Sequence, residues 1–483
     1  MMLTPEAVTG AMHTIRHIHL IGIGGSGMNG IARILLNLGF EISGSDQQRS
    51  ETVRQLESEG ATVAIGHDGA HLQGADVVVI SSAIGEENPE VVEARRQGIP
   101  VIPRAEMLAE LMRFRYGIAV AGTHGKTTTT SLVAALLDAA GLDPTYVIGG
   151  RINTANHAAG ESGAQLGQGR YLVAEADESD ASFLHLQPMI AVVTNIDEDH
   201  MSTYGGDREQ LDHTFEEFIH HLPFYGCAVL CADDPGVQRI MDRLSRPLLR
   251  YGITEDIEQN GLDFAAAAIT LQPGCSCFTL CRPGKSGLPI TLNLPGEHNV
   301  LNALAAIAVA SHLGVEDRVL VEALANFQGI ARRFQNYGML NIGSNRVELI
   351  DDYGHHPSEV AATIDTVRKS WPGRRLLLAF QPHRYSRTRD LYEDFVEVLS
   401  RVDQLLLLEV YPAGESPIPG ADGRSLARSI RARGAVEPVL LKDVDELLAL
   451  LPNLVHEEDL LLFSGAGSIG QAAPRASERW SAA

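Results

Sequence analysis

The sequence contains little lysine, little cysteine and no long hydrophobic run. Of its 38 basic residues only four are lysines, at positions 126, 285, 369 and 442, and the other 34 are arginines. Five cysteines without a C-x-x-C pair argue against a disulfide framework and favour a reducing compartment. No apolar run approaches the roughly 20 residues that span a bilayer, and residues 1–17 show no secretory signal. We therefore expect a cytoplasmic protein without membrane insertion.

Three of the cysteines, Cys275, Cys277 and Cys281, lie close enough in sequence to be considered as metal ligands. Their spacing follows the alternation of a strand, so we interpret them as small buried hydrophobic residues instead. The surrounding residues 255–292 have the least regular pattern in the chain, which favours a β-rich region.

The chain is acidic. Asp and Glu outnumber Lys and Arg by 61 to 38, which gives a formal net charge of −23. Such a charge opposes non-specific binding to nucleic acid, and we expect no nucleic-acid partner. The composition, with 45 % hydrophobic and 20 % charged residues, is typical of a globular protein. At roughly 150 residues per domain, 483 residues predict about three domains.

Strand-like and helix-like segments alternate along the chain, as they do in α/β proteins with parallel sheets. Near the N-terminus, Ile18–Ile21 and Glu41–Ser45 are predicted strands, and Gly27–Leu38 and Pro89–Gln97 are predicted helices. The predicted fold class is α/β with three domains. These are an N-terminal Rossmann-like domain (1–115), a central P-loop ATPase-type domain with a parallel sheet (116–328) and a C-terminal Rossmann-like domain (329–483).

A glycine-rich turn, GIGGSG at residues 22–27, follows the first strand and opens a helix. Glycines there allow close backbone approach, and the helix N-terminus attracts a diphosphate. Asp46, after the second strand, can accept from a ribose hydroxyl. The pattern is typical of an NAD site, but a UDP-sugar offers the same diphosphate and ribose. Glycines that serve only helix–strand packing are the third possibility.

A second glycine loop, GTHGKTTTT at residues 122–130, also connects a buried strand to a helix. Its backbone N–H groups would surround phosphate oxygens, Lys126 would reach the β and γ phosphates, and the Thr127 hydroxyl would bind Mg²⁺. The loop is G-x-x-G-K-T rather than the common G-x4-G-K-T. Lysine suits this turn because its ammonium is a compact charge on a flexible stem, whereas the guanidinium of arginine is planar and forked.

Acidic motifs follow two further strands. EADES begins at Glu175, and TNIDEDH ends at His200. Both place hard oxygen ligands at the carboxyl ends of strands, where ligands collect in open α/β sheets. Either motif alone could be a charged solvated loop, but together with the phosphate loop they favour a magnesium site.

Histidine and arginine motifs lie late in the chain, at residues 332–333, 351–357 and 381–387. Zinc binding by His355 and His356 is disfavoured because adjacent side chains point in different directions and no third ligand is evident. Arg384 and Arg387 follow a predicted strand and suit a carboxylate or a phosphate, although surface ion pairs are the alternative.

The motifs GTHGKTTTT, EADESD, TNIDEDH, GEHNVLNAL, ARRFQ, DDYGHHP and FQPHRYSRT occur in this order. Over about residues 15–470 the sequence resembles the Mur ligases of peptidoglycan synthesis. GTHGKT alone would indicate only the wider superfamily that includes folylpolyglutamate synthetases. The GIGGSGM loop, DDYGHHP and PHRYSRT resemble the branch of the family that adds L-alanine.

The resemblance implies a division of labour among these residues. The UDP-substrate site would consist of Gly22, Gly24, Gly25, Ser26, Gly27, Asp46, His67, Ser81 and Ser82. The ATP site would consist of Gly122, Thr123, His124, Gly125, Lys126, Thr127, Thr128, Asn299, Arg333, Asp352 and Tyr353. Thr127, Glu175 and His200 would bind metal, and His355, His383, Arg384 and Arg387 would form the amino-acid site. Lys126, His200, Arg384 and His355 would be the catalytic residues.

The implied reaction is the ATP-dependent joining of L-alanine to the lactyl carboxylate of UDP-N-acetylmuramate through an acyl phosphate, with two Mg²⁺ ions. His200 is assigned as a metal ligand rather than a general base. The sequence leaves open whether the protein is a monomer or a homodimer. It also leaves open the affinities, the order of substrate binding and the selectivity for alanine over glycine or serine.

One departure from the wider family is informative. Several Mur ligases that add later residues use a carbamylated lysine after the DH motif, but residues 201–226 contain no lysine. This supports the alanine-adding branch and leaves open what orients the second Mg²⁺. The main alternative is the branch that attaches a recycled tripeptide to the same UDP-sugar. An NAD-dependent oxidoreductase is a distant alternative, because it leaves Lys126, Thr127 and the acidic motifs unexplained.

Overall fold

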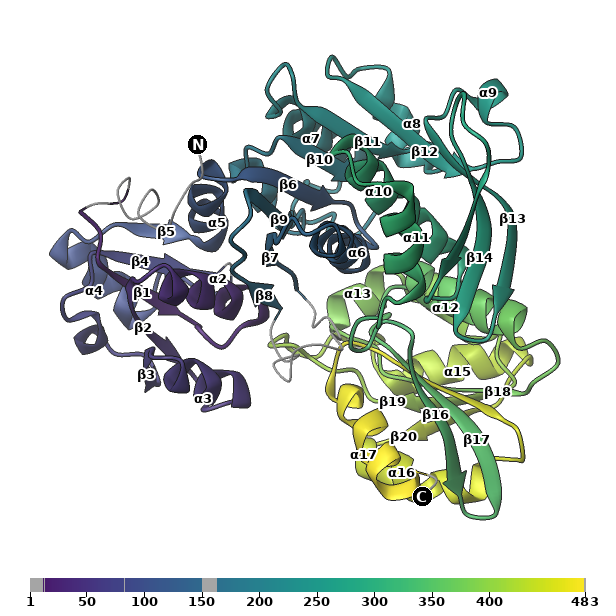
Figure 1. Cartoon of the computed structure of the whole chain (residues 1–483). Coiled ribbons are helices and arrows are strands. Elements are labelled where there is room, and N and C mark those ends of the chain that lie inside the picture. The colour runs from purple at the N-terminus through teal and green to yellow at the C-terminus, as the bar shows by residue number, and fades with distance from the viewer. Residues whose placement is uncertain (1–11, 13, 82, 150–162, 482–483) are drawn as a thin grey trace. The chain divides into compact units, whose positions relative to one another are not determined.

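The computed structural model of the chain describes residues 12, 14–81, 83–149 and 163–481. In these residues, helices alternate with the strands of three sheets (Figure 1). The chain forms two compact units. The first comprises Met1–Ala268, Phe278–Ile290 and Leu301–Gln328, and the second comprises Ile269–Cys277, Thr291–Val300 and Gly329–Ala483.

The first sheet lies in the first unit and has the strand order β3-β2-β1-β4-β5. Its strands are β1 (His17–Ile21), β2 (Glu41–Asp46), β3 (Thr62–Ile65), β4 (Val77–Ile80) and β5 (Val101–Pro103), and all neighbours are parallel. The helices that accompany it are α2 (Ser26–Asn37), α3 (Glu51–Ser58), α4 (Pro89–Gln97) and α5 (Arg104–Arg113). The chain leaves β1 toward β2 on one side and returns to β4 on the other. Ligands of open α/β sheets bind at such a reversal, which here is where the first glycine loop lies.

The second sheet has ten strands in the order β15-β14-β13-β12-β11-β10-β6-β9-β7-β8. The strands are β6 (Tyr116–Ala121), β7 (Thr145–Val147), β8 (Ala164–Gln165), β9 (Tyr171–Glu175), β10 (Ile190–Val193), β11 (Cys227–Cys231), β12 (Leu248–Ile253), β13 (Phe264–Gln272), β14 (Cys275–Cys281) and β15 (Leu288–Leu292). From β13 to β7 the neighbours are parallel, whereas β8 runs antiparallel to β7. The expected parallel sheet is therefore correct for the centre and differs at the β8 edge. The β-rich stretch expected at residues 255–292 is confirmed.

Six further helices belong to this part of the chain. They are α6 (Lys126–Ala139), α7 (Arg208–His220), α8 (Pro235–Met241), α9 (Ile257–Asn260), α10 (Glu297–His312) and α11 (Asp317–Ala325). Helix α6 begins directly after the second glycine loop and buries Leu132, Val133 and Leu137 completely. Burial of that apolar face anchors the helix, and the helix start fixes the position of the loop.

The third sheet lies in the second unit and has the order β16-β17-β21-β18-β19-β20. Its strands are β16 (Gln335–Ile342), β17 (Asn345–Asp352), β18 (Leu376–Phe380), β19 (Gln404–Leu408), β20 (Pro438–Leu441) and β21 (Leu460–Ser464), with only the β16–β17 pair antiparallel. Its helices are α12 (Pro357–Ser370), α13 (Tyr385–Asp390), α14 (Tyr392–Leu399), α15 (Gly423–Arg433), α16 (Val444–Leu454) and α17 (Ala472–Trp480). Leu376 and Leu378 pack on one face and Leu377 and Ala379 on the other. Burial of both faces explains the continuous apolar run of β18.

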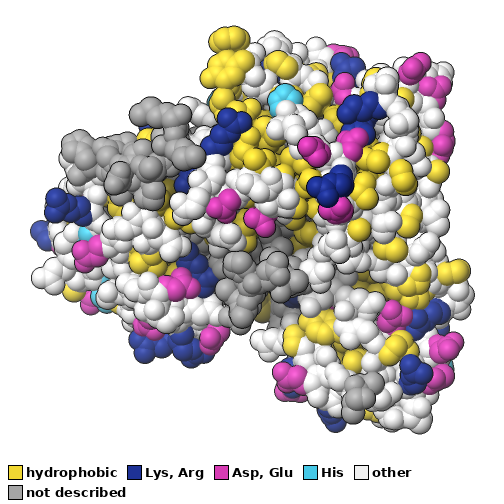
Figure 2. Space-filling model, in the orientation of Figure 1, with side chains coloured by type: hydrophobic (Ala, Val, Ile, Leu, Met, Phe, Trp, Pro, Cys, Tyr) yellow, Lys and Arg dark blue, Asp and Glu magenta, His cyan; other side chains and the backbone are white. Residues whose placement is uncertain are grey.

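The three-domain α/β prediction is confirmed, while the domain borders at residues 115 and 328 stay predictions. No helix in the described part of the chain combines the length and apolar composition that a bilayer crossing requires. On the face shown in Figure 2, basic side chains (dark blue) and acidic side chains (magenta) are interspersed.

The interpretation of the cysteines was wrong in one respect. Cys275, Cys277 and Cys281 lie in a strand as expected, but Ser276, Phe278 and Leu280 occupy its buried face and the cysteines lie on its half-exposed face. Alternation alone indicates that two faces exist and does not tell which one is buried.

Candidate functional site

The first glycine loop is held by the end of β2. Gly22 has a φ of +75°, which favours glycine, and its N–H donates to the Ser45 carbonyl at 2.8 Å. The Gly24 N–H donates to Asp46 Oδ2 at 2.9 Å, and a Cβ on Gly24 would lie 2.9 Å from that same oxygen. Asp46, assigned from the sequence to a ribose, thus also fixes the loop.

Other residues predicted for the UDP-substrate site surround this loop. Ser81 Oγ lies 4.0 Å from the position of a Cβ on Gly22, and a Cβ on Gly27 would lie 3.0 Å from an Arg104 nitrogen. His67 Nδ1 contacts Ser45 Oγ at 3.0 Å and Glu90 at 3.1 Å. Ser82, also predicted for this site, lies outside the described residues. The structure therefore connects His67 to the loop through Ser45.

The second glycine loop, residues 122–125, connects β6 to α6 as predicted. Gly122 and Gly125 have φ values of +129° and +83°. A Cβ would lie 2.1 Å from Thr194 Oγ1 at Gly122 and 2.4 Å from Asn302 Oδ1 at Gly125. Both positions require glycine for two reasons, the backbone conformation and the lack of space.

Residues 194–197, which follow β10, form hydrogen bonds to this loop, which follows the neighbouring strand β6. Asn195 Oδ1 accepts the His124 N–H at 2.8 Å, and Asn195 Nδ2 donates to the His124 carbonyl at 2.9 Å. Thr194 Oγ1 donates to the same carbonyl at 2.6 Å, and the Asp197 N–H donates to Thr123 Oγ1 at 2.9 Å. Thr194, Asn195 and Asp197 therefore hold the second glycine loop in shape, while the metal ligand predicted in this motif, His200, stays a prediction.

Lys126, the first residue of α6, is held by acceptors from two elements. Its Nζ donates to the Gly122 carbonyl at 2.7 Å and the Thr123 carbonyl at 3.2 Å, and lies 2.9 and 2.8 Å from the two Glu178 oxygens. Burial acts to lower the pKa of Lys126, but Glu178, Asp177 and Glu175 outweigh it and raise the pKa. Burial raises the pKa of Glu178 to about 7 against the opposing effect of Lys126. The lysine therefore keeps its charge.

The residues predicted to bind metal lie at one edge of the second sheet. Thr127 is in the first turn of α6 after β6, Glu175 ends β9, and His200 follows β10. β10, β6 and β9 are adjacent parallel strands, so their carboxyl ends meet at the same edge. Glu175 Oε1 accepts the Gly149 N–H at 2.8 Å, and His200 has a φ of +55°. Two hard oxygen donors and one imidazole fit Mg²⁺ that also binds nucleotide phosphates.

The residues predicted to complete the ATP site lie in the second unit, where Asp352 already has backbone partners. Its Oδ2 accepts the Phe334 N–H at 2.8 Å and its Oδ1 accepts the Gly354 N–H at 2.9 Å. The guanidinium carbons of Arg332 and Arg333 lie 5.1 and 5.0 Å from the Tyr353 ring centre. Asn299 Nδ2 donates to the Pro295 carbonyl at 2.7 Å. These side chains shape the backbone around the predicted site.

The residues predicted for the amino-acid site follow the carboxyl ends of β17 and β18. The His355 and His383 ring centres are 5.8 Å apart, and the His383 ring stacks on Tyr411 at 5.5 Å. Burial, followed by the charge of Arg387, lowers the pKa of His383 to about 4. Burial also lowers the pKa of His355 to about 4 against the effect of a neighbouring carboxylate. Both imidazoles are neutral at pH 7.

Arg384, next in this cluster, has a φ of +71°, an uncommon conformation for a residue other than glycine. Its N–H donates to the Tyr411 carbonyl at 2.8 Å, and its side chain is half-exposed. Arg387 is buried at 8 % exposure. Strained backbone is concentrated at functional sites, which supports the assignment of Arg384.

Three family models match the chain in succession. They are the Mur ligase family catalytic domain over residues 17–116, the Mur ligase middle domain over residues 120–310 and the Mur ligase glutamate ligase domain over residues 332–467. The chain belongs to the Mur ligase family.

Individual Mur ligases resemble it over nearly their whole length. A UDP-N-acetylmuramate–L-alanine ligase of Methylococcus capsulatus is 58 % identical over 99 % of this chain and 98 % of its own. The crystal structure of a UDP-N-acetylmuramate-alanine ligase of Thermotoga maritima is 28 % identical with a TM-score of 0.79, covering 96 % of this chain and 99 % of that one. A murein peptide ligase of Psychrobacter arcticus is 26 % identical with a TM-score of 0.70, covering 96 % and 98 %.

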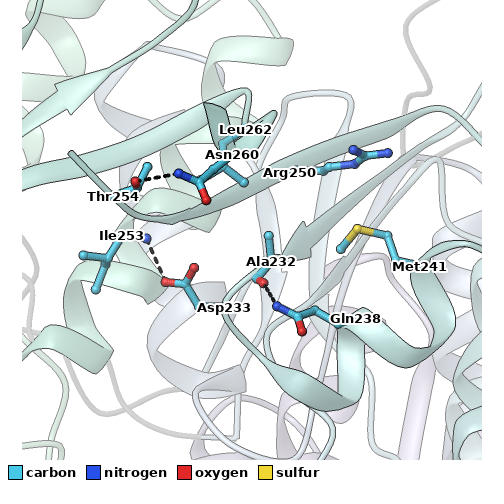
Figure 3. A pocket seen from close by; sticks show the side chains of 9 residues that line it. All are labelled: Ala232, Asp233, Gln238, Met241, Arg250, Ile253, Thr254, Asn260 and Leu262. Atoms are coloured by element: carbon cyan, nitrogen blue, oxygen red, sulfur yellow. Dashed lines mark hydrogen bonds between the residues drawn. The ribbon is translucent and has the colours of Figure 1, made fainter. Parts of the chain in front are cut away.

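A cavity of about 310 Å³ in this Mur ligase is lined by residues of α8 and β12 and of the segments that follow β11 and β12 (Figure 3). Asp233 Oδ2 accepts the Ile253 N–H at 2.7 Å, and Asn260 Nδ2 donates to Thr254 Oγ1 at 2.9 Å. None of the residues predicted for the site is among those that line it. The Asp233 and Asn260 side chains are hydrogen-bonded to residues that surround the cavity, so we assign the cavity no role in a reaction.

Several residues that shape the Mur ligase site were not singled out from the sequence. They are Glu178, Thr194, Asn195 and Asp197 at the phosphate loop and Glu90 beside His67. The first four lie within the acidic motifs EADES and TNIDEDH. These motifs indicated a site, but they did not indicate that these residues contact the second glycine loop. Glu90 carries no signal in the sequence that separates it from its exposed neighbours.

Proposed function

We propose that this chain joins L-alanine to the lactyl carboxylate of UDP-N-acetylmuramate with ATP, in peptidoglycan precursor synthesis. The observation that carries the proposal is the 58 % identity over 99 % of the chain to a UDP-N-acetylmuramate–L-alanine ligase. The phosphate loop, with Lys126 among carbonyl and carboxylate acceptors, supports the use of ATP. A cytoplasmic location and a monomeric or homodimeric state remain part of the proposal.

Mg²⁺ is proposed as the metal, held by Thr127, Glu175 and His200. The donors fit because hard oxygens predominate and nucleotide oxygens and water supply the remaining ligands. When bound, the ion neutralises negative charge on the phosphates of ATP.

In the first half of the proposed reaction, the lactyl carboxylate attacks the γ-phosphate of ATP and yields an acyl phosphate and ADP. Both reactants are anions, so the protein must orient them and neutralise their charge. The backbone N–H groups of residues 122–125 and the Lys126 ammonium supply positive charge where the phosphates would bind. The network of Thr194 and Asn195 keeps the loop in shape, which reduces the reorganisation needed on binding.

In the second half, the amine of L-alanine attacks the acyl carbonyl and phosphate leaves. An amine attacks only when its nitrogen has lost the ammonium proton. His355 Nδ1 lies 3.1 Å from the Tyr353 carbonyl and so carries the proton on that nitrogen, which leaves Nε2 as an acceptor. Arg384 and Arg387 suit the alanine carboxylate and the anionic leaving group.

Phosphate release tests the proposal. The purified chain is incubated with ATP, Mg²⁺ and UDP-N-acetylmuramate, and either L-alanine or the murein tripeptide is added. We expect ADP and phosphate formation, with a UDP-N-acetylmuramoyl-L-alanine product, only with L-alanine. Activity with the tripeptide alone would instead assign the chain to the murein peptide ligases.

Replacement of Arg384 by alanine is expected to weaken alanine use. Loss of the guanidinium removes a charge-assisted contact to a carboxylate, so KM for L-alanine should rise about 10- to 100-fold. The KM for ATP should stay within about twofold of wild type. Arg389→Ala is the matched control, because Arg389 lies on α13 but is exposed and paired with Asp390. An unchanged KM for alanine in Arg384→Ala would contradict the assignment.

A further inference from the structure

Glu90 is a fully buried carboxylate beside the first glycine loop. It is the second residue of α4, and its own N–H is capped by Asn88 Oδ1 at 2.9 Å. Helix capping therefore does not use the Glu90 side chain, whose exposed fraction is 0 %. A glutamate loses much hydration free energy on burial, so partners must compensate for the lost water.

Both carboxylate oxygens of Glu90 have such partners. Oε2 accepts from the Ser45 hydroxyl at 2.6 Å and lies 3.1 Å from His67 Nδ1. Oε1 lies 2.7 Å from His71 Nδ1 and 3.7 Å from His19 Nε2. Burial acts to raise the pKa of Glu90, but the nearby His19 imidazole and the hydrogen bonds from Ser45 and His71 outweigh it and lower the pKa to about 2.

An ionised carboxylate can only accept hydrogen bonds. His67 and His71 must therefore each carry a proton on Nδ1, and in a neutral imidazole Nε2 is then the acceptor. The tautomer of His67 is thus set by Glu90 together with Ser45, whose hydroxyl proton is donated to Glu90, so that its oxygen can only accept from His67 Nδ1 at 3.0 Å. His67 is 16 % exposed at its side chain, whereas Glu90 is fully enclosed.

Ser45 connects this cluster to the glycine loop. Its hydroxyl donates to Glu90, and its carbonyl accepts the N–H groups of Gly22 at 2.8 Å and Ile23 at 3.1 Å. The end of β2 is therefore tied on one side to Glu90 and on the other to the loop.

We propose that Glu90 is a positioning residue of the UDP-substrate site, which fixes the His67 tautomer and, through Ser45, the glycine loop. The proposal rests on the proposed function, because the family resemblance to a UDP-N-acetylmuramate ligase is what assigns the UDP moiety to that loop and to His67. Glu90 does not touch the substrate. It presents His67 Nε2 as an acceptor for an N–H or O–H of the nucleotide.

The test replaces Glu90 by glutamine in the full chain. Glutamine keeps the size of the side chain but can donate as well as accept, so it no longer imposes one tautomer. We expect Kd for UDP and KM for UDP-N-acetylmuramate to rise about 10- to 100-fold, with KM for ATP within about twofold of wild type. Nitrogen NMR of the histidines should show His67 protonated on Nδ1 in wild type and a mixture of tautomers in the variant.

Glu93→Gln is the matched control, because Glu93 lies one turn further along α4 and pairs with Arg96 at the surface. It should leave both affinities and the His67 spectrum unchanged. Should Glu90→Gln not fold, Glu90→Asp serves instead: it keeps the charge, withdraws the carboxylate from His67 and should raise the same Kd. Unchanged UDP affinity in a folded variant, or an equal loss of affinity for ATP, would overturn the proposal.

Measurements of UDP affinity and of the His67 tautomer need no turnover. The role of Glu90 can therefore be tested separately from the proposed ligase reaction. A wild-type chain that binds UDP but does not ligate alanine would contradict the proposed function only. Weakened UDP binding in Glu90→Gln would still support the role of Glu90.

Discussion

Lys126→Arg is expected to lower kcat/KM for ATP by about 10³-fold. The Lys126 ammonium fits within 3.2 Å of two carbonyls of its own loop and within 2.9 Å of Glu178. A guanidinium keeps the charge, but its planar fork is larger and its donors point in fixed directions. It therefore cannot occupy the same position without opening the loop, and the phosphates lose a point charge where negative charge develops.

A binding measurement and a control variant test whether the effect of Lys126→Arg is specific to ATP. Binding of UDP-N-acetylmuramate to Lys126→Arg, measured by calorimetry, should stay within about twofold of wild type, because the first sheet is untouched. Lys442→Arg is the control, since Lys442 is 86 % exposed and should tolerate the same exchange. Substantial turnover by Lys126→Arg would refute the phosphate-binding role of Lys126.

Gly122→Ala is expected to affect both stability and ATP use. At a φ of +129° an L side chain is strained, and the added Cβ would lie 2.1 Å from Thr194 Oγ1. Thr194 and the loop must then separate, which breaks the bond from Thr194 to the His124 carbonyl. We expect the free energy of unfolding to fall by about 3 kcal/mol and KM for ATP to rise more than about 100-fold.

Gly141→Ala is the control for Gly122→Ala, because it introduces backbone strain without a steric conflict. Gly141 follows the other end of α6, has a φ of +71° and has nothing within 4 Å of its Cβ position. Its replacement should cost about 1 kcal/mol of stability, from the backbone alone, with KM for ATP unchanged. Denaturant unfolding and steady-state kinetics measure both variants. Equal effects of the two substitutions would contradict the steric argument.

The features that the sequence predicted correctly depend on residues that lie close together along the chain. The helix at Pro89–Gln97 has the predicted ends because Asn88 caps its start and Gly98, with a φ of +73°, ends it. Both glycine loops could be located for a similar reason, since each combines an apolar strand with glycines and a helix start within a few residues.

The sequence did not predict features that depend on which strands become neighbours. Thr194 and Asn195 brace the phosphate loop because β10 pairs with β6, which lies about 70 residues earlier in the chain. Glu90 and Glu93 are alike in the sequence of α4, and only tertiary packing buries the first and leaves the second at the surface. Local patterns carry no information on such contacts.

Lys126 already has a carboxyl partner within its own chain. Glu178 gives Lys126 the carboxylate contact that a phosphate would otherwise give, so in the proposed reaction an incoming nucleotide has to compete with a tethered ligand of effectively high concentration. A monovalent anion gains little from this exchange, whereas a triphosphate brings several charges to the loop. In the proposed reaction the same carboxylate recaptures the ammonium when ADP leaves, so the Lys126–Glu178 pair is expected to favour product release.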